Sequence, residues 1–270
     1  MCYRHQTEIP LFMKVGLFIP CYVDQFYPQV GKATFRLLQH FGMQVSVPLQ
    51  QTCCGQPMAN SGFECESVKT LQHQFSLFAD CEYIVAPSAS CIMHIREMGE
   101  KDYLSPEDKA IAHRFLDFTE FMHRFKLIDQ YEGQSQAKVV LHKSCHGLRG
   151  MGLGQCSESM TPADNLQLEL LKKVEGIQMI TPNRADECCG FGGTFAVSEE
   201  AISVRMGRDR LQDYISSGAE IITSGDMSCM MHLEGIIKRE KLPVKVKHLA
   251  EILFESVHLH KKQAQHVASY

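Results

Sequence analysis

Cys53-Cys54-Gly55 and Cys188-Cys189-Gly190 are two copies of one short cysteine pattern, and the rest of the sequence is organised around them. In each copy one cysteine precedes the doublet, with 31 and 42 residues in between, and one follows it, with 36 and 39 residues in between. This repetition predicts a duplicated fold in which each half carries a thiolate site. Eight of the twelve cysteines belong to the two sets: Cys21, Cys53, Cys54 and Cys91, and then Cys145, Cys188, Cys189 and Cys229.

The composition indicates a globular protein in a reducing compartment. A chain of 270 residues with 44% hydrophobic residues can bury a core, and a net charge of −4 gives no general attraction to nucleic acid. No stretch has the ~18 consecutive apolar residues that would span a bilayer, and the N-terminus lacks a secretory pattern. We therefore expect a soluble, cytoplasmic chain without a disulfide framework.

Short apolar runs alternate with amphipathic stretches along the whole chain, which predicts an α/β fold with parallel sheets covered by helices. The strands are expected at 15–19, 45–47, 83–86, 138–141, 177–180, 220–223 and 244–246. The helices are expected at 28–41, 62–79, 91–98, 163–175, 198–217, 229–240 and 247–257. The same order occurs twice, so we predict two tandem, pseudo-symmetric units, each a small, mainly parallel sheet flanked by helices.

The boundary between the units is placed near residue 135. The first repeat then covers 13–135 and the second 136–257. Residues 1–12 are interpreted as an N-terminal extension before Met13, and 258–270 as a polar C-terminal tail. The segment 100–137 is charged and is predicted to be mostly helical, with a linker at 133–136.

The cysteines share one predicted location, just past the C-terminal ends of strands. Cys21 and Cys145 each follow the first strand of a repeat, and 88–91 and 224–229 follow another strand. Ligands of open α/β sheets bind in the crevice at those ends. Cysteines that are far apart in sequence are therefore expected to converge in space.

The doublets favour a multinuclear cluster. Adjacent α-carbons lie ~3.8 Å apart, so two neighbouring thiolates fit two different irons better than two corners of one zinc tetrahedron. Neither the paired spacing of structural zinc nor the C-x-x-C of a thioredoxin or c-type haem is present, and ferredoxin spacing is absent too. An iron–sulfur centre in each half is the prediction, with zinc and a vicinal disulfide as alternatives. Cys2, Cys65, Cys81 and Cys156 are interpreted as small hydrophobic residues.

Glycines and histidines accompany the cysteines. Gly55 and Gly190 let the backbone approach a cluster closely and direct N–H groups at sulfur. The run 190–193 does not match the G-x-G-x-x-G of a dinucleotide site. His142 lies three residues before Cys145 and is a candidate ligand or donor at the second site. His94 and His232 each lie three residues after the last cysteine of a set, where a structural role is more usual; no catalytic residue can be assigned.

Six stretches carry a resemblance that covers residues 13 to about 256, namely 53–62, 87–91, 142–145, 186–195, 226–229 and 246–253. They resemble the LutA/YkgE family, lactate utilisation protein A. This family carries the CCG cysteine-rich domain that is also found in the cysteine-rich subunit of heterodisulfide reductase. The iron–sulfur subunits of glycolate oxidase and of anaerobic glycerol-3-phosphate dehydrogenase share the domain.

The resemblance implies an oxidoreductase subunit that carries two cysteine-ligated [4Fe-4S] clusters, one per repeat, for electron transfer. With LutB-like and LutC-like partners it would oxidise L-lactate to pyruvate. The alternatives are an iron–sulfur subunit of a glycolate or other 2-hydroxy-acid oxidase, a heterodisulfide-reductase-like enzyme, and a non-catalytic, metal-stabilised scaffold subunit.

One departure from the resemblance concerns cluster type. The motif of heterodisulfide reductase ends in C-x-x-C and holds a five-cysteine non-cubane cluster, whereas here Ser88 and Asp226 replace the first cysteine of that pair. Four cysteines remain per site, which disfavours the non-cubane form and disulfide-reductase chemistry. Asp226 is kept with His142 as an additional candidate ligand.

Overall fold

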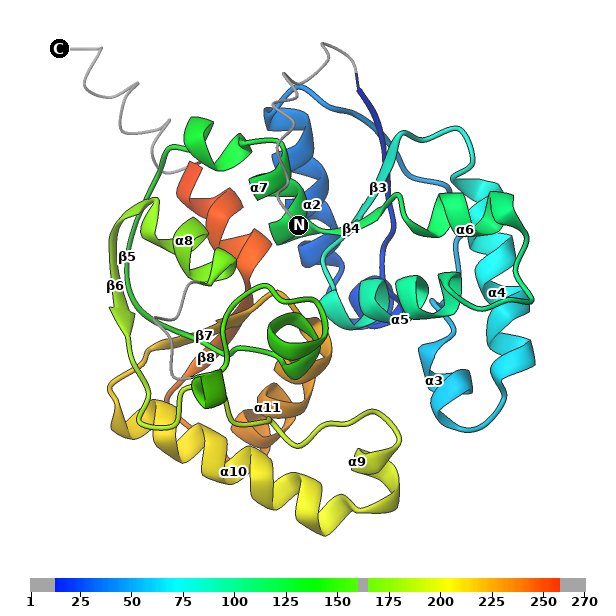
Figure 1. The fold of residues 1–270 in the computed structure, drawn as a ribbon. Coiled ribbons are helices and arrows are strands. Elements are labelled where there is room, and N and C mark those ends of the chain that lie inside the picture. Colours follow the sequence, from blue (N-terminus) through cyan, green and yellow to red (C-terminus); the bar gives the residue numbers. More distant parts are fainter. Residues whose placement is uncertain (1–12, 160–164, 258–270) are drawn as a thin grey trace, which may run out of the picture.

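The computed structural model describes residues 13–159 and 165–257, and it contains two four-stranded parallel sheets of identical topology (Figure 1). The expected extension at 1–12 and the expected tail at 258–270 lie outside the described residues. The first sheet has the order β2 (Gln44–Ser46), β1 (Lys14–Leu17), β3 (Tyr83–Ala86) and β4 (Phe115–Asp117). The second has the order β6 (Val174–Ile180), β5 (Gly133–Leu141), β7 (Ile221–Ser224) and β8 (Lys245–His248). The predicted α/β duplication is confirmed.

Helices connect the strands of the first sheet in parallel crossovers. A typical one is α2 (Pro28–His40), which begins at a proline, buries Val30, Leu37 and Leu38, and is followed by Gly42 with a φ of +81°. The helices of this half are α1 (Cys21–Phe26), α2 (Pro28–His40), α3 (Gln56–Asn60), α4 (Glu64–Leu77), α5 (Ala89–Gly99), α6 (Pro106–Ala112) and α7 (Phe118–Arg124). The 3₁₀ turn η1 (Leu127–Gln130) then leads into β5.

The second half has an equivalent set of helices. It begins with the short π-helix η2 (His146–Gly150) and the 3₁₀ turn η3 (Ser157–Ser159). The helices that follow are α8 (Leu166–Lys172), α9 (Phe195–Ser198), α10 (Glu200–Ser216) and α11 (Met227–Glu240), and residues 249–257 form a terminal helix. No helix within the described part of the chain is long and apolar enough to cross a membrane.

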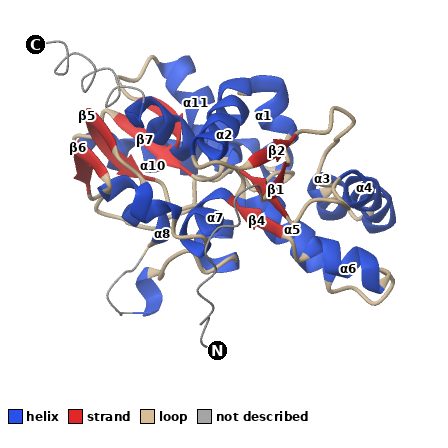
Figure 2. Ribbon diagram, turned by 90° about the horizontal axis from the view of Figure 1, so that it is seen from above, coloured by secondary structure: helices blue, strands red, loops and turns tan. Residues whose placement is uncertain are grey.

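The two sheets share one apolar core. Its buried residues come from both sheets and from helices of both halves, such as Leu37 of α2, Phe121 of α7, Leu170 of α8 and Leu253 of the terminal helix. Figure 2 shows α2 and α7 lying between the two sets of strands. Helix α7 packs on α8, and α2 packs on the terminal helix, so each half covers part of the other. The packing of these helices fixes the orientation of the two halves relative to each other.

Two sequence predictions between residues 100 and 137 are wrong. The segment contains a strand, β4, that completes the first sheet, and residues 133–136 belong to β5 instead of a linker. Strand β4 is only three residues long and wholly buried, so it shows no alternation. The start of β5 is polar because this end pairs with β6 alone, which leaves Gln134 and Ser135 half-buried and Gln136 exposed. The second sheet therefore begins three residues before the predicted second repeat.

Candidate metal centre

The cysteines lie where the strand-end argument predicts. Cys21 opens α1 after β1, and Cys145 precedes η2 after β5. Cys91 and Cys229 lie in the first turns of α5 and α11. Backbone N–H groups are unpaired at helix N-termini, and the helix dipole there stabilises an anionic thiolate.

All eight cysteines line one cavity of about 460 Å³ between the halves. The sequence predicted two related sites but gave no reason to expect them to face each other. The remaining lining residues come from both halves, and among them Tyr22 packs edge-to-face on Phe191 with the ring centres 6.0 Å apart. None of the described residues in this lining is a lysine or arginine. The cavity is therefore rich in sulfur and lacks permanent positive charge.

Within each set the thiols contact one another in the same order. Cys21 contacts Cys53, with the two sulfurs 3.9 Å apart, and Cys53 and Cys91 both contact Cys54. In the second set the order is Cys145, Cys188, Cys189 and Cys229. The duplication thus extends from the backbone to the arrangement of sulfur atoms.

Hydrogen bonding gives the thiols of each set different acidities. The pKa values of Cys53 and Cys188 lie well below the ordinary range, because each accepts a hydrogen bond from the thiol before the doublet and another from its doublet neighbour. The donors Cys21 and Cys145 have raised pKa values for the same reason. The hydrogen bond with Cys189 lowers the pKa of Cys229 to about 6, and His142 adds to this. Four adjacent thiols cannot all ionise without a cation among them, which is the donor set of a metal centre.

Both doublet glycines are required by the backbone. Gly55 and Gly190 each have a φ of +89°, and each donates its N–H to the first cysteine of its doublet, at N···S distances of 3.4 and 3.3 Å. A Cβ on Gly190 would lie 2.6 Å from the carbonyl oxygen of Ser203, and one on Gly55 would meet Ser67. The glycine therefore lets the loop turn beside the next helix while pointing an N–H at sulfur, as the sequence predicted.

The matched histidines have matched structural contacts. His94 Nε2 lies 3.0 Å from Ser67 Oγ, and His232 Nε2 lies 3.2 Å from the Ser203 carbonyl oxygen. Each therefore ties the helix that bears the last cysteine to the second helix after the doublet, α4 in the first half and α10 in the second. Burial lowers the pKa of His94 to about 4, so it is neutral at neutral pH. Neither histidine lines the cavity.

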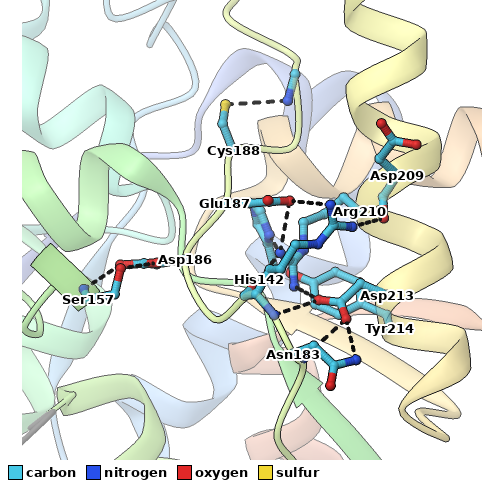
Figure 3. A network of polar contacts seen from close by, with 12 residues as sticks. His142, Ser157, Asn183, Asp186, Glu187, Cys188, Asp209, Arg210, Asp213 and Tyr214 are labelled. Carbon is cyan, nitrogen blue, oxygen red and sulfur yellow. Dashed lines mark hydrogen bonds and ion pairs between the residues drawn. The ribbon is translucent and has the colours of Figure 1, made fainter.

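Two histidines lie near the second set: His146, whose Nδ1 is 3.8 Å from the sulfur of Cys145, and the buried His142, which lies beside Tyr214 (Figure 3). His142 is 1% exposed, and a ring nitrogen lies within 4.8 Å of the sulfurs of Cys189 and Cys229. Its Nδ1 lies 2.7 Å from the hydroxyl of Tyr214, and its Nε2 has no hydrogen-bond partner among the described residues. The predicted proximity of His142 to the second site is found.

The carboxylate of Asp226 is hydrogen-bonded to protein groups of both halves. Its carboxylate is fully buried and caps α11 by accepting from the Ser228 N–H. It also accepts from the Ser90 N–H at 2.9 Å and from the hydroxyls of Ser90 and Ser228 at 3.2 and 2.7 Å. Ser88 caps α5 in the same way by accepting from the Cys91 N–H at 3.4 Å. Both positions that lack the expected cysteine are therefore helix caps.

Sequence reasoning missed the residues that hold the second doublet loop. Asp213 accepts hydrogen bonds from the backbone N–H groups of Asn183 and Arg184, both at 3.1 Å, and pairs with the buried Arg210 at 2.8 Å (Figure 3). Asp213 and Arg210 lie three residues apart on α10, which is ordinary for a surface ion pair. Nothing in the sequence marks this one as buried.

The remaining described cysteines lie outside the cavity. Cys81 is buried, as a small hydrophobic residue would be, whereas Cys65 is exposed and Cys156 is half-buried, so that interpretation is wrong for Cys65. Cys2 lies outside the described residues. The doublet cysteines are free thiols, so neither doublet forms a vicinal disulfide.

The residues present fit an iron–sulfur centre in each half. Four sulfur atoms per set lie in contact, backbone N–H groups point at two of them, and a low-charge cavity surrounds them. Thiolate ligands with N–H donors to sulfur are the usual environment of such clusters. The donor sets could also take other thiophilic metals.

Comparisons with known proteins agree with this site. The family model of the cysteine-rich domain matches twice, at residues 15–96 and 139–234. Lactate utilization protein A of Halalkalibacterium halodurans is 39% identical over 246 residues, which cover 89% of this chain and 96% of the relative. The protein of the same name from Exiguobacterium sp. strain AT1b is 36% identical over 249 residues, covering 90% and 98%.

Solved structures add no argument. Glutamate racemase from Francisella tularensis subsp. tularensis matches over 93% of this chain and 81% of its own, but with a TM-score of 0.37 and 12% identity. The family is shown instead by the sequence relatives and by the two matches to the cysteine-rich domain. The chain belongs to the lactate utilization protein A family.

Proposed function

We propose that this chain is a cytoplasmic iron–sulfur subunit of a complex that oxidises L-lactate to pyruvate. The observation that carries the proposal is that the eight cysteines of two matched sets line one cavity, each set in continuous thiol contact. The names of the relatives supply the substrate. The proposed ligands are Cys21, Cys53, Cys54 and Cys91 for one centre and Cys145, Cys188, Cys189 and Cys229 for the other.

Electron transfer is the role that these residues support best. Two bound [4Fe-4S] clusters would each carry one electron, so together they could take up the two electrons that the oxidation of a 2-hydroxy acid releases. The chain itself holds the sulfurs in place through Gly55 and Gly190, and it directs backbone N–H groups at Cys53 and Cys188. These bonds stabilise negative charge on sulfur.

Lactate binding is assigned to a partner subunit. A small carboxylate is usually recognised by an arginine or lysine, often through a two-pronged ion pair. The described lining of the cysteine cavity offers neither of them, and His146 is its one histidine. The proposed partners are therefore LutB-like and LutC-like subunits that bind the substrate and exchange electrons with this chain.

Anaerobic purification with iron and sulfide analysis tests the cofactor. Two four-iron centres predict about eight irons per chain. A colourless protein with stoichiometric zinc would contradict the proposal and favour a metal-stabilised scaffold.

Reduction by substrate tests the reaction. With the partner subunits present, L-lactate should bleach the visible iron–sulfur absorption, and the chain alone should not respond to it. Bleaching by glycolate but not by lactate would keep the redox role and change the substrate. Bleaching of the isolated chain by lactate would contradict the assignment of lactate binding to a partner.

A further inference from the structure

The two thiolate sites differ in the residue that follows the first strand of each half. The backbone N–H of Phe18 donates to the Val85 carbonyl at 2.9 Å, and that of His142 donates to the Thr223 carbonyl at 2.7 Å. Val85 and Thr223 pair with the last residues of β1 and β5. Phe18 and His142 therefore occupy equivalent positions, each three residues before the first cysteine of its set.

The aromatic residue beside this position also differs between the halves: it is the polar Tyr214 in the second half and the apolar Phe78 in the first. Tyr214 lies eleven residues after Ser203, and Phe78 lies eleven residues after Ser67, the serine that contacts the equivalent histidine. Phe18 and Phe78 both pack edge-to-face on Phe115, with ring centres 6.1 and 6.0 Å apart. The first site is thus backed by an apolar aromatic cluster and the second by a polar histidine–tyrosine pair (Figure 3).

The environment of Tyr214 sets the direction of the hydrogen bond. Its hydroxyl is fully buried, and its hydrogen needs an acceptor. Arg210 stacks on the ring at 4.2 Å and can only donate, so His142 Nδ1 is the acceptor that the described residues provide. A neutral histidine that accepts at Nδ1 carries its hydrogen on Nε2. That nitrogen has no hydrogen-bond partner among the described residues, and the His142 ring has a nitrogen within 4.8 Å of the sulfurs of Cys189 and Cys229.

We propose that His142 donates its Nε2–H to a cysteine sulfur of the second site, with Tyr214 as the residue that positions it, and that this raises the reduction potential of the second centre above that of the first. The inference rests on the proposed function. An N–H donor stabilises the added negative charge of the reduced centre, whereas the aromatic cluster around Phe18 does not. Electrons in the chain would therefore settle in the second half.

The same geometry opposes a ligand role for His142. A ring nitrogen that carries hydrogen has no lone pair for a metal. The donor assignment and the ligand assignment therefore predict opposite tautomers, which can be measured.

The tautomer is tested in the full-length, iron-free chain by ¹⁵N NMR of the histidine rings. We expect the hydrogen of the neutral His142 ring on Nε2. In Tyr214→Phe, which lacks the hydroxyl that fixes this tautomer, the ring should no longer hold a single tautomer. Hydrogen on Nδ1 in the wild type would overturn the proposal, and this measurement does not depend on any variant being stable.

The potential is tested by redox titration, followed by EPR, of the iron-loaded chain. Tyr214→Phe and the double variant His142→Phe/Tyr214→Phe, which install the residues of the first half, should lower one midpoint potential and leave the other unchanged, at full iron content. The matched control is Tyr131→Phe, which removes a buried hydroxyl bonded to the Leu253 carbonyl outside the cavity and should shift neither potential.

The failures of the two proposals are distinguishable. Unchanged potentials in both iron-loaded variants would overturn this inference and leave the proposed function intact. Loss of iron on replacing His142 would show it to be a ligand and would likewise overturn the donor assignment. A wild-type chain that takes up no iron would instead overturn the proposed function.

Discussion

Ser88 and Asp226 occupy equivalent positions in the two halves, and they pair with each other as an isolated antiparallel bridge across the boundary between the halves. Each is also the cap of the helix that carries the last cysteine of its set. The residues that replace the cysteine of the longer motif therefore have a physical role. They join the two halves at the cavity and hold α5 and α11 in position.

Asp226→Asn should destabilise the chain strongly. The buried carboxylate accepts four hydrogen bonds from Ser90 and Ser228, and an amide would place its own donors against some of them. We expect a loss of about 2–4 kcal/mol in the free energy of unfolding. Urea denaturation measures it.

The matched control for Asp226→Asn is Asp209→Asn, at an exposed pair with Arg205 on α10, which should cost less than about 1 kcal/mol. Equal effects of the two changes would show that the Asp226 bridge contributes little to the association of the halves.

Gly190→Ala should cost more than Gly218→Ala. Both residues have a positive φ, near +89° and +87°, but a Cβ at Gly190 would press on the Ser203 carbonyl and on Met206, whereas at Gly218 it would meet no atom of the described residues within 4 Å. We expect about 1 kcal/mol for Gly218→Ala from backbone strain, and roughly 2–3 kcal/mol or more for Gly190→Ala.

Thermal unfolding of the two alanine variants, compared with the wild type, measures this difference. A Gly190→Ala variant as stable as Gly218→Ala would contradict the close approach of the doublet loop to α10.

The longer elements could be predicted because their signals are local. Helices such as α2, α4, α10 and α11 bury one face at helical spacing, and the strands that end at Leu17, Ala86 and Leu141 are apolar runs followed by chemistry-bearing residues. Strand β4 could not be predicted because its three residues are all buried and show no alternation of apolar and polar side chains. The polar start of β5 could not be predicted because its pairing with β6 makes it a strand, whereas its own residues show no strand pattern.

The composition of each cysteine set could be predicted, but the shared cavity could not. That cavity depends on α2 packing against the terminal helix and α7 against α8, contacts between residues more than 40 positions apart. The same holds for His142 and Tyr214, which are 72 residues apart and meet only because β5 lies beside α10. Pairwise packing of distant elements leaves no periodic trace in the sequence.

Cys189→Ser and Cys54→Ser should each remove one centre. Each serine breaks one continuous set of sulfur contacts, so iron should fall from about eight to about four per chain, and the double variant should bind almost none. Iron analysis and EPR measure this. Cys65→Ser, at an exposed cysteine outside the cavity, is the control and should keep full iron. Loss of all iron from either single variant would contradict one independent centre per repeat.

Asp117 and His248 should give the iron-free chain opposite responses to pH. They are the last residues of β4 and β8, in equivalent registers, and each caps the next helix, Asp117 by accepting from the Thr119 N–H at 2.8 Å and His248 from the Ala250 N–H at 3.1 Å. Burial lowers the pKa of His248 to about 4 and raises that of Asp117 to about 7. Between pH 4 and 6.5 the unfolded chain binds more protons at position 248 than the folded chain, so His248 makes stability rise with pH. Asp117 keeps its proton in the folded chain over a similar range, so it makes stability fall as pH rises from about 4 to about 7.

Single asparagine variants separate the two contributions, because asparagine is uncharged and still caps a helix. His248→Asn should remove the rising contribution, and Asp117→Asn should remove the falling one, each by at most about 1.4 kcal/mol per pH unit since one proton is involved. Urea unfolding from pH 4 to 7.5 measures both slopes. His113→Asn, at a half-exposed surface histidine paired with Glu100, is the control and should change the slope little. If both buried variants shifted the slope in the same direction, the assigned protonation states of the two caps would be wrong.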